Sequence, residues 1–199
     1  ICFGAIINIS DSMTLNQILD SVYALPQQSK DAMELHIREV QLPKGHLLFE
    51  AGRIVTTIYL VKKGMVRAYS DTGNNQVTFW FGKEGDIVIC MNSHVANEKG
   101  YENIELLEDS EIYEMDSGKI NVLFETDIHI ANWGRKFAEM ELLRTEERFI
   151  SRQFKTASER YADLLKNFPH LIQRVQLGHI ASYLGITQAS LSRIRAEIK

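Results

Sequence analysis

The sequence predicts an α+β fold made of an antiparallel jelly roll (a double-stranded β-helix), one long helix and a small C-terminal helical unit. Between residues 42 and 115, short β-rich runs alternate with turns rich in Gly, Asp and Asn. Residues 128–154 contain no proline and carry apolar residues at helical spacing. Residues 177–198 form two short amphipathic segments that meet at Gly185.

Two packing helices are expected before the roll. Apolar residues recur at helical spacing from Thr14 to Leu25, and Pro26 ends that helix. Ser29 is the expected cap of a second helix, which runs to about Val40.

Seven β-rich runs make up the expected roll, and glycine-containing turns separate them. The runs are Leu47–Phe49, Ile58–Val61, Val66–Tyr69, Val77–Phe81, Ile87–Cys90, Ile104–Leu107 and Ile112–Met115. A roll of this size encloses a small ligand or is filled by its own side chains.

A short helix over Ser117–Phe124 precedes a long one over Ile128–Phe154, which is apolar along two stripes. One stripe is Ile130, Trp133, Phe137 and Met140, and the other is Ala131, Ala138, Leu142 and Phe149. Because such a helix must bury both sides, we expect the first stripe to lie on the roll and the second to pair with a twofold copy. The alternative is a helix enclosed between two parts of one chain.

The segment Leu177–Ile198 has the spacing of a DNA-binding helix-turn-helix. The small Ala181 allows two steeply crossing helices to approach, and Gly185 can take the left-handed conformation that turns the chain. Leu191, six residues further on, faces back toward the first helix. Another amphipathic helix is expected over Thr156–Phe168, with a hinge at Ser151–Ser158.

The outward face of the last helix carries the candidate DNA-reading residues, which are Thr187, Gln188, Ala189, Ser190, Ser192 and Arg193. Arg193 has the geometry for a bidentate contact to guanine, and Gln188 suits adenine. Thr187 and Ser190 suit phosphate oxygens at a helix N-terminus. The alternative is an ordinary helical hairpin with a solvated polar face.

Charge is distributed unevenly along the chain, whose formal net charge is −4. Residues 144–199 carry ten Lys or Arg against five Asp or Glu, a balance of +5. Residues 1–143 carry twelve against twenty-one, a balance of −9. Since the basic part contains the helix-turn-helix, this asymmetry indicates nucleic-acid contact at one end.

Composition disfavours several other classes. Two cysteines, Cys2 and Cys90, cannot form a disulfide framework or supply four thiolates to an iron–sulfur cluster. No run approaches the ~20 apolar residues of a membrane helix, so no membrane partner is expected. The opening ICFGAIINI lacks a basic leader and is a poor signal peptide, which makes Met13 a candidate natural start. No metal or other cofactor is expected, because no second Cys/His pair follows Cys90 and His94.

The stretch GHLLFEAGRIVTTIYLVKKGMVRAY, with FGKEGDI after it, resembles the first half of a cyclic-nucleotide-binding β-roll. Together with the C-terminal helix-turn-helix, it resembles the Crp/Fnr family of bacterial transcription regulators. The resemblance covers roughly Leu42 to the end. It implies a cyclic-nucleotide-binding-like sensor domain at 13–127, a dimerisation helix at 128–154 and a winged-helix-like helix-turn-helix domain at 155–199. The implied partners are double-stranded DNA, a second copy in a homodimer, RNA polymerase and an unknown small-molecule effector. The resemblance also implies a cytoplasmic protein.

The candidate ligand loop departs from the family pattern. Members that bind cyclic AMP carry a Gly-Glu pair for the ribose hydroxyl and an Arg-Ser pair for the cyclic phosphate. Here the first pair reads Gly85-Asp86, or is absent if its place falls further along the chain. Gly100-Tyr101 stands about where Arg-Ser is expected, with Lys99 as the only local cation. Because a buried phosphate that faces carboxylates without a guanidinium is disfavoured, we expect the roll not to bind cyclic AMP.

The leading hypothesis is a homodimeric, sequence-specific transcription regulator. A second hypothesis is a ligand-binding regulatory module whose helix-turn-helix does not bind DNA; the basic C-terminal balance and Arg193 favour the first. A third is a metal-dependent enzyme on a double-stranded roll, and we expect no enzyme because the histidines are scattered. Five of the six are His46, His94, His129, His170 and His179, and the sixth is His36.

Overall fold

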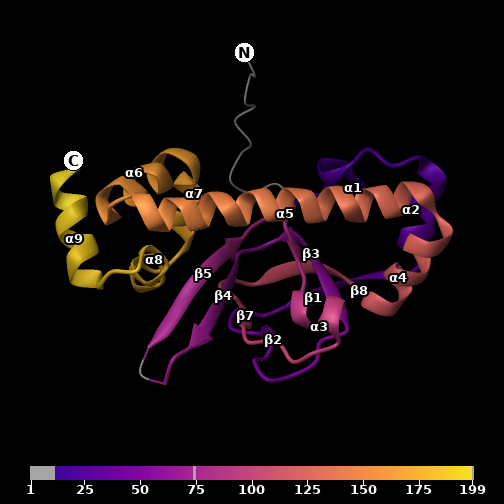
Figure 1. Cartoon of the computed structure of the whole chain (residues 1–199), viewed down its shortest axis with the longest axis horizontal. Helices are drawn as coiled ribbons and strands as arrows, with labels where there is room; N and C mark the ends of the chain where they lie inside the picture. Colours follow the sequence, from indigo (N-terminus) through magenta and orange to yellow (C-terminus); the bar gives the residue numbers. More distant parts are fainter. Residues whose placement is uncertain (1–11, 74, 199) are drawn as a thin grey trace, which may run out of the picture.

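The computed structural model describes residues 12–73 and 75–198, which are arranged around one long helix, α5 (Ile128–Phe154). Figure 1 shows the strands as a roll on one side of α5, with the first helices of the chain near one end of α5 and the last helices near the other. The three predicted parts are therefore present in the predicted order. Cys2 and the opening ICFGAIINI lie outside the described residues.

The chain begins with two short helices, α1 (Leu15–Val22) and α2 (Gln27–Glu34). Thr14 and Gln17 form a capping box at the start of α1. Ser29, the predicted cap of the second helix, instead lies inside α2, where its buried hydroxyl donates to Asp127 Oδ2 at 2.7 Å.

The predicted continuation of the second helix to about Val40 is wrong. Residues Ile37–Leu42 form strand β1, which pairs along its whole length with β8 (Ser110–Asp116). The backbone groups of β1 find their partners far away in the sequence, so the tertiary pairing overrides the local helical pattern.

Two four-stranded antiparallel sheets make the roll, in the orders β1-β8-β3-β6 and β2-β7-β4-β5. This arrangement confirms the predicted jelly roll. The remaining strands are β2 (Leu47–Phe49), β3 (Thr57–Lys63), β4 (Val66–Asp71), β5 (Gln76–Gly82), β6 (Ile87–Val88) and β7 (Asn103–Leu106).

The predicted strand over Ile87–Cys90 ends early, and helix α3 (Met91–Ala96) follows it. Cys90 is the extended N-cap residue of α3. The hydroxyl of Ser93 accepts from the N–H of Val55 at 3.0 Å and donates to the carbonyl of Glu98 at 2.9 Å. The bond from Val55 holds α3 against the segment that joins β2 to β3, a contact that the local sequence pattern does not predict.

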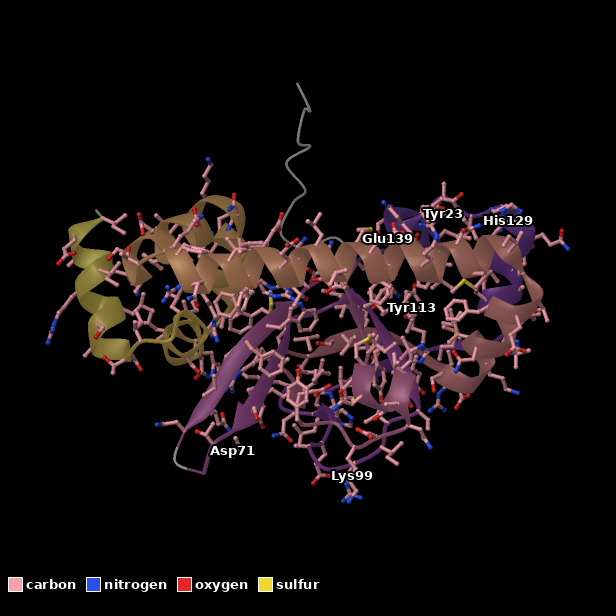
Figure 2. The ribbon with its side chains drawn as sticks, viewed as in Figure 1. Tyr23, Asp71, Lys99, Tyr113, His129 and Glu139 are labelled. Carbon is pink, nitrogen blue, oxygen red and sulfur yellow. The ribbon has the colours of Figure 1, made fainter. Side chains whose placement is uncertain are left out.

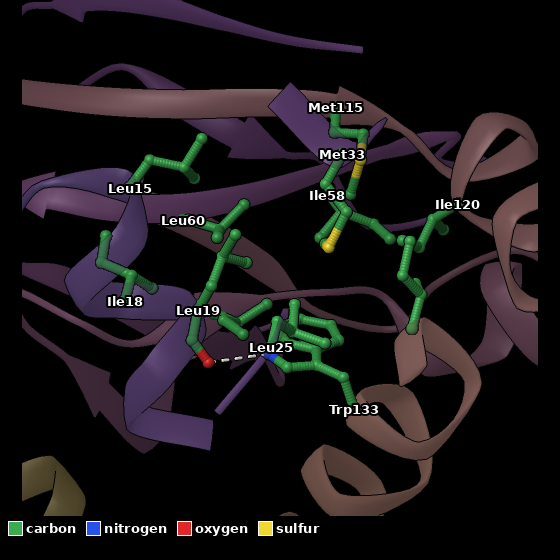
Figure 3. Packing of buried hydrophobic residues seen from close by; sticks show 12 residues of the cluster. Leu15, Ile18, Leu19, Leu25, Met33, Ile58, Leu60, Met115, Ile120 and Trp133 are labelled. Atoms are coloured by element: carbon green, nitrogen blue, oxygen red, sulfur yellow. Dashed lines mark hydrogen bonds between the residues drawn. The ribbon is translucent and has the colours of Figure 1, made fainter. Parts of the chain in front are cut away.

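Side chains fill the roll and join it to α1 and α5. One buried cluster lies between the sheets: Leu48, Phe49, Val61, Val66, Ala68, Val88, Cys90, Ile104, Leu106 and Ile112. A second cluster includes Trp133 of α5, whose Nε1 donates to the carbonyl of Leu19 at 2.9 Å (Figure 3). The buried indole therefore has its polar group satisfied.

Helix α5 follows α4 (Ser117–Thr126) and is capped by Asp127. The inner stripe packs on the rest of the fold, with Ile130 and Trp133 buried and Phe137 and Met140 half-buried. Of the outer stripe, Ala131 is half-buried, whereas Ala138, Leu142 and Phe149 are exposed.

The chain ends with four helices, which we call the C-terminal unit: α6 (Ala157–Asn167), α7 (Pro169–Arg174), α8 (Leu177–Leu184) and α9 (Gln188–Glu197). The sequence does not predict α7, although its proline fits the first turn, where no backbone N–H is needed. The core of this unit, which contains Tyr161, Ile180 and Leu191, also includes the fully buried Met65 of the roll. The unit and the roll thus share one buried cluster.

Candidate nucleic-acid interface

Helices α8 and α9 meet at the glycine corner that the sequence predicts. Gly185 has φ +70°, the left-handed conformation, and its N–H donates to the carbonyl of Ser182 at 3.0 Å. Ile186 N–H donates to the carbonyl of Ala181, also at 3.0 Å. Ala181 and Leu191 are both buried in the contact between the two helices. The corner fixes the direction in which α9 leaves the C-terminal unit.

The structure brings the predicted DNA-reading residues together on α9 and its cap. Thr187 is the N-cap residue, and its hydroxyl accepts from the N–H of Ser190 at 3.1 Å. Ser190 is half-buried, whereas the other five are exposed: Thr187, Gln188, Ala189, Ser192 and Arg193. Within the described residues, Arg193 forms no ion pair, so its charge faces solvent without a local counterion.

The side chains of Ser192 and Gln188 already contact groups of α8 or α9, which the sequence alone does not indicate. The hydroxyl of Ser192 donates back to the carbonyl of Gln188 at 3.0 Å, one helical turn earlier. Gln188 lies over the start of α8, since a Cβ added to Gly178 would lie 3.5 Å from its Oε1. Gln188 therefore has to swing outward to contact a base.

Two arginines that sequence reasoning missed stabilise the corner from behind. Arg152, near the end of α5, donates from Nη2 to the carbonyl of Tyr183 at 3.1 Å. Arg160 of α6 donates from Nη2 to the carbonyl of Leu184 at 2.7 Å. Both carbonyls lie at the C-terminal end of α8, where a positive charge is favoured. The only sequence signal is that both residues belong to the basic part of the chain.

Helix α8 is also bound to the roll of its own subunit. The hydroxyl of Ser182 accepts from the N–H of Thr78 at 2.9 Å and donates to the carbonyl of Gln76 at 2.7 Å. Both partners lie on β5, the edge strand of its sheet, so α8 satisfies backbone groups that an edge strand leaves open.

A charged contact reinforces this docking. Arg174 of α7 donates to both carboxylate oxygens of Glu84, at 2.7 and 2.9 Å, and also pairs with Glu108. Burial opposes the charged form of Glu84, but the hydrogen bonds from Arg174 and from Gly64 N–H keep the pKa of Glu84 below its ordinary value. The roll and α7 are thus joined by a bidentate ion pair.

The predicted ligand-loop residues fall into two groups with different neighbours. Asp86, next to Gly85, accepts from Lys83 N–H at 2.8 Å and lies 3.9 Å from Arg144 of α5, and burial raises the pKa of Asp86. In contrast, the Lys99–Tyr101 segment pairs with the turn before β3, where Gly100 exchanges backbone hydrogen bonds with Gly52 and Arg53. Figure 2 shows Lys99 on the side of the roll away from α5.

Around Gly100, the groups that approach the backbone are neutral or acidic. A Cβ added at Gly100 would lie 2.8 Å from Cys90 Sγ and 3.7 Å from Glu102 Oε2. Glu102 is buried, and its Oε2 accepts from the N–H of Tyr101 at 3.2 Å. The Tyr101 ring is exposed and lies 6.0 Å from the ring of Phe79.

The described part of the chain contains no group of three or more His, Cys, Asp or Glu side chains that could hold a metal ion. None of its helices is long and apolar enough to cross a membrane.

Known proteins share this sequence pattern and this fold. Residues 39–127 match the family described as the cyclic nucleotide-binding domain. The anaerobic regulatory protein of Aggregatibacter actinomycetemcomitans is 28% identical over 185 residues, which are 86% of this chain and 71% of that protein. The fumarate and nitrate reduction regulatory protein of Yersinia pestis is 25% identical over 170 residues, 79% of this chain and 67% of that one. The structure of FixK2 from Bradyrhizobium japonicum aligns with a TM-score of 0.68 at 20% identity, over 81% of this chain and 84% of FixK2.

Proposed function

Because the chain belongs to the Crp/Fnr family of transcriptional regulators, we propose that it is a homodimer that binds a specific DNA sequence through α9. The observation that carries this proposal is the exposed polar face of α9, held outward by the glycine corner at Gly185. Arg193 is exposed on that face and lacks a counterion among the described residues. It is the residue best suited to a bidentate contact with guanine.

The remaining α9 side chains supply supporting contacts. Gln188 reads an adjacent base after moving away from α8. Thr187 and the first turn of α9 lie where a phosphate oxygen can accept from backbone N–H groups. Arg195, also exposed on α9, adds positive charge toward the DNA backbone.

The exposed stripe of α5 is the proposed surface for the second subunit. Leu142 and Phe149 are 71% and 66% exposed, and Phe154 at the end of the helix is 76% exposed. Large apolar side chains gathered along one helix are typical of an interaction surface. A twofold partner on this stripe places two α9 helices in successive major grooves, ~34 Å apart.

We further propose that the roll senses something other than cyclic AMP, or serves only as a scaffold. The segment around Gly100 offers a thiol and a buried carboxylate where a cyclic phosphate needs a cation. Isothermal titration calorimetry with cyclic AMP is expected to give no saturable heat. Saturable micromolar binding contradicts this part of the proposal.

A DNA-binding regulator of this type acts in the cytoplasm and contacts RNA polymerase, and we propose no catalytic role for it. The small-molecule effector, if the roll takes one, has a different chemistry from cyclic AMP.

A gel mobility-shift assay on DNA fragments selected by the protein tests the proposal. We expect Arg193→Ala to weaken specific binding by at least tenfold, since a good bidentate base contact contributes ~1–3 kcal/mol. Arg53→Ala is the matched control, because it removes the same charge from an exposed turn of the roll, where Arg53 pairs with Glu50. If the parent protein selects no fragment, the chain is instead a regulatory module whose helix-turn-helix does not bind DNA.

A further inference from the structure

The carbonyl groups of the last turn of α8, those of residues 181–184, are hydrogen-bonded by donors from two sources. The first two accept from backbone N–H groups of the glycine corner. The last two accept from side chains of other helices: Tyr183 from Arg152 Nη2 at 3.1 Å, and Leu184 from Arg160 Nη2 at 2.7 Å. The end of α8, where α9 changes direction, therefore depends on α5 and α6 for the partners of its final carbonyls.

Arg160 joins this turn to the point where α5 gives way to α6. While its Nη2 donates to the carbonyl of Leu184, its Nη1 donates to the carbonyl of Lys155. Lys155 is the C-cap residue of α5, and Arg160 itself lies in α6. A single planar guanidinium thus connects three helices, and its fork fixes the directions of both hydrogen bonds.

The surroundings of Arg160 indicate a role in positioning rather than a gain in stability. Both groups that accept from its terminal nitrogens are backbone carbonyls, not carboxylates. Its Nε is buried and has no hydrogen-bond partner among the described residues. Since an unpaired buried donor costs free energy, the place of this side chain is best explained by the two carbonyls that it bridges.

We propose that Arg160 is a positioning residue for DNA recognition, which fixes the direction of α9 relative to α5. This inference rests on the function proposed above. Helix α5 carries the proposed twofold contact, and the glycine corner sets the direction in which α9 leaves α8. Because Arg160 connects the two, with Arg152 in support, it limits the half-site spacings that a pair of α9 helices can reach.

A charge-conserving variant isolates this role. Arg160→Lys keeps the positive charge near the DNA but presents one nitrogen in place of the two that contact Lys155 and Leu184. The contacts of Ser182 with β5 remain, so α8 stays docked on the roll. Arg148→Lys is the matched control, because Arg148 is also half-buried and donates to Thr145 of its own helix, α5.

Fluorescence anisotropy with the full-length protein compares three duplexes. They are the selected operator, the same operator with one base pair inserted between its half-sites, and a duplex with a single half-site. The insertion moves one half-site ~3.4 Å along and ~34° around the duplex. We expect the parent to bind the inserted duplex more weakly than the operator.

In Arg160→Lys, the ratio of these two Kd values is expected to fall about fivefold, because α9 is no longer held in one direction. The Kd for the single half-site is expected to stay within about twofold of the parent, since the reading face of α9 is unchanged. Arg148→Lys is expected to keep the ratio of the parent. A cooperative urea transition shows that each variant is folded.

The inference is overturned if Arg160→Lys keeps the ratio of the parent, or if Arg148→Lys lowers the ratio equally. It is also overturned if Arg160→Lys weakens binding to all three duplexes by the same factor, because that result shows a role in folding alone. A parent that binds the operator without a spacing preference contradicts it too. A parent that selects no DNA contradicts the proposed function itself, so the two failures are distinguishable.

Discussion

Gly185 holds the corner between α8 and α9 with φ +70°, in a region that L side chains rarely adopt. Apart from its two chain neighbours, no described residue has an atom within 4 Å of the position that a Cβ would take there. The need for glycine is therefore conformational rather than steric. The direction of α9 depends on this one backbone torsion and on the small Ala181, which is buried between α8 and α9.

Gly185→Ala is expected to lower the free energy of unfolding by ~1 kcal/mol, the cost of placing a Cβ in the left-handed region. Urea unfolding followed by circular dichroism measures this difference. Gly178→Ala is the control, because Gly178 lies within α8 without a positive φ and alanine favours a helix. Equal destabilisation by the two substitutions would show that the corner does not depend on its φ.

Spacing within the sequence was enough to find Gly185, Ala181, Leu191 and the exposed face of α9, because these residues interact within one local unit. It was not enough to find Arg152 and Arg160, whose hydrogen bonds to α8 come from helices α5 and α6. Nor could it show that Ser182 bonds to β5, more than 100 residues earlier. Contacts of this kind depend on tertiary placement, which periodicity does not encode.

At the scale of elements, helix α5 has one side that is packed within the subunit and another that is exposed. Its inner stripe is covered by α1 and the roll around Trp133, while Leu142 and Phe149 on the outer stripe are largely exposed among the described residues. Helix α5 has the predicted bounds, Ile128–Phe154. They can be predicted because a long run without proline, capped at its start, depends only on neighbouring residues in the sequence. The local pattern predicts helix where β1 forms, because the partner of β1, strand β8, lies far along the chain.

Leu142→Glu is expected to shift the protein from dimer to monomer, raising the dimer Kd at least tenfold. Each subunit would otherwise bury a leucine worth ~1.5–3 kcal/mol at the twofold interface, and a buried carboxylate without a partner costs more. Sedimentation equilibrium measures the change. Lys136→Gln alters the net charge of exposed α5 by the same amount and is expected to leave the dimer intact. A parent protein that is monomeric at every concentration would contradict this assignment.

At the scale of the whole molecule, α5 joins a roll that is filled with its own side chains to a C-terminal unit that docks on that roll. Three sets of contacts make the docking specific: Met65 in the shared core, Ser182 on β5, and Arg174 on Glu84 and Glu108. The roll therefore contacts α7 and α8 directly, in addition to its contact with α5. In a twofold dimer, the same contacts fix how far apart the two α9 helices lie.

The separation of the two reading helices is the property that tests the account most directly. Random double-stranded DNA fragments are selected with the purified protein, sequenced, and then footprinted with hydroxyl radicals. We expect an inverted repeat whose half-sites lie one helical turn apart, ~34 Å or 10–10.5 base pairs from centre to centre, with protection on one face of the duplex. A single unrepeated half-site, or half-sites at a spacing unrelated to the helical turn, would contradict it.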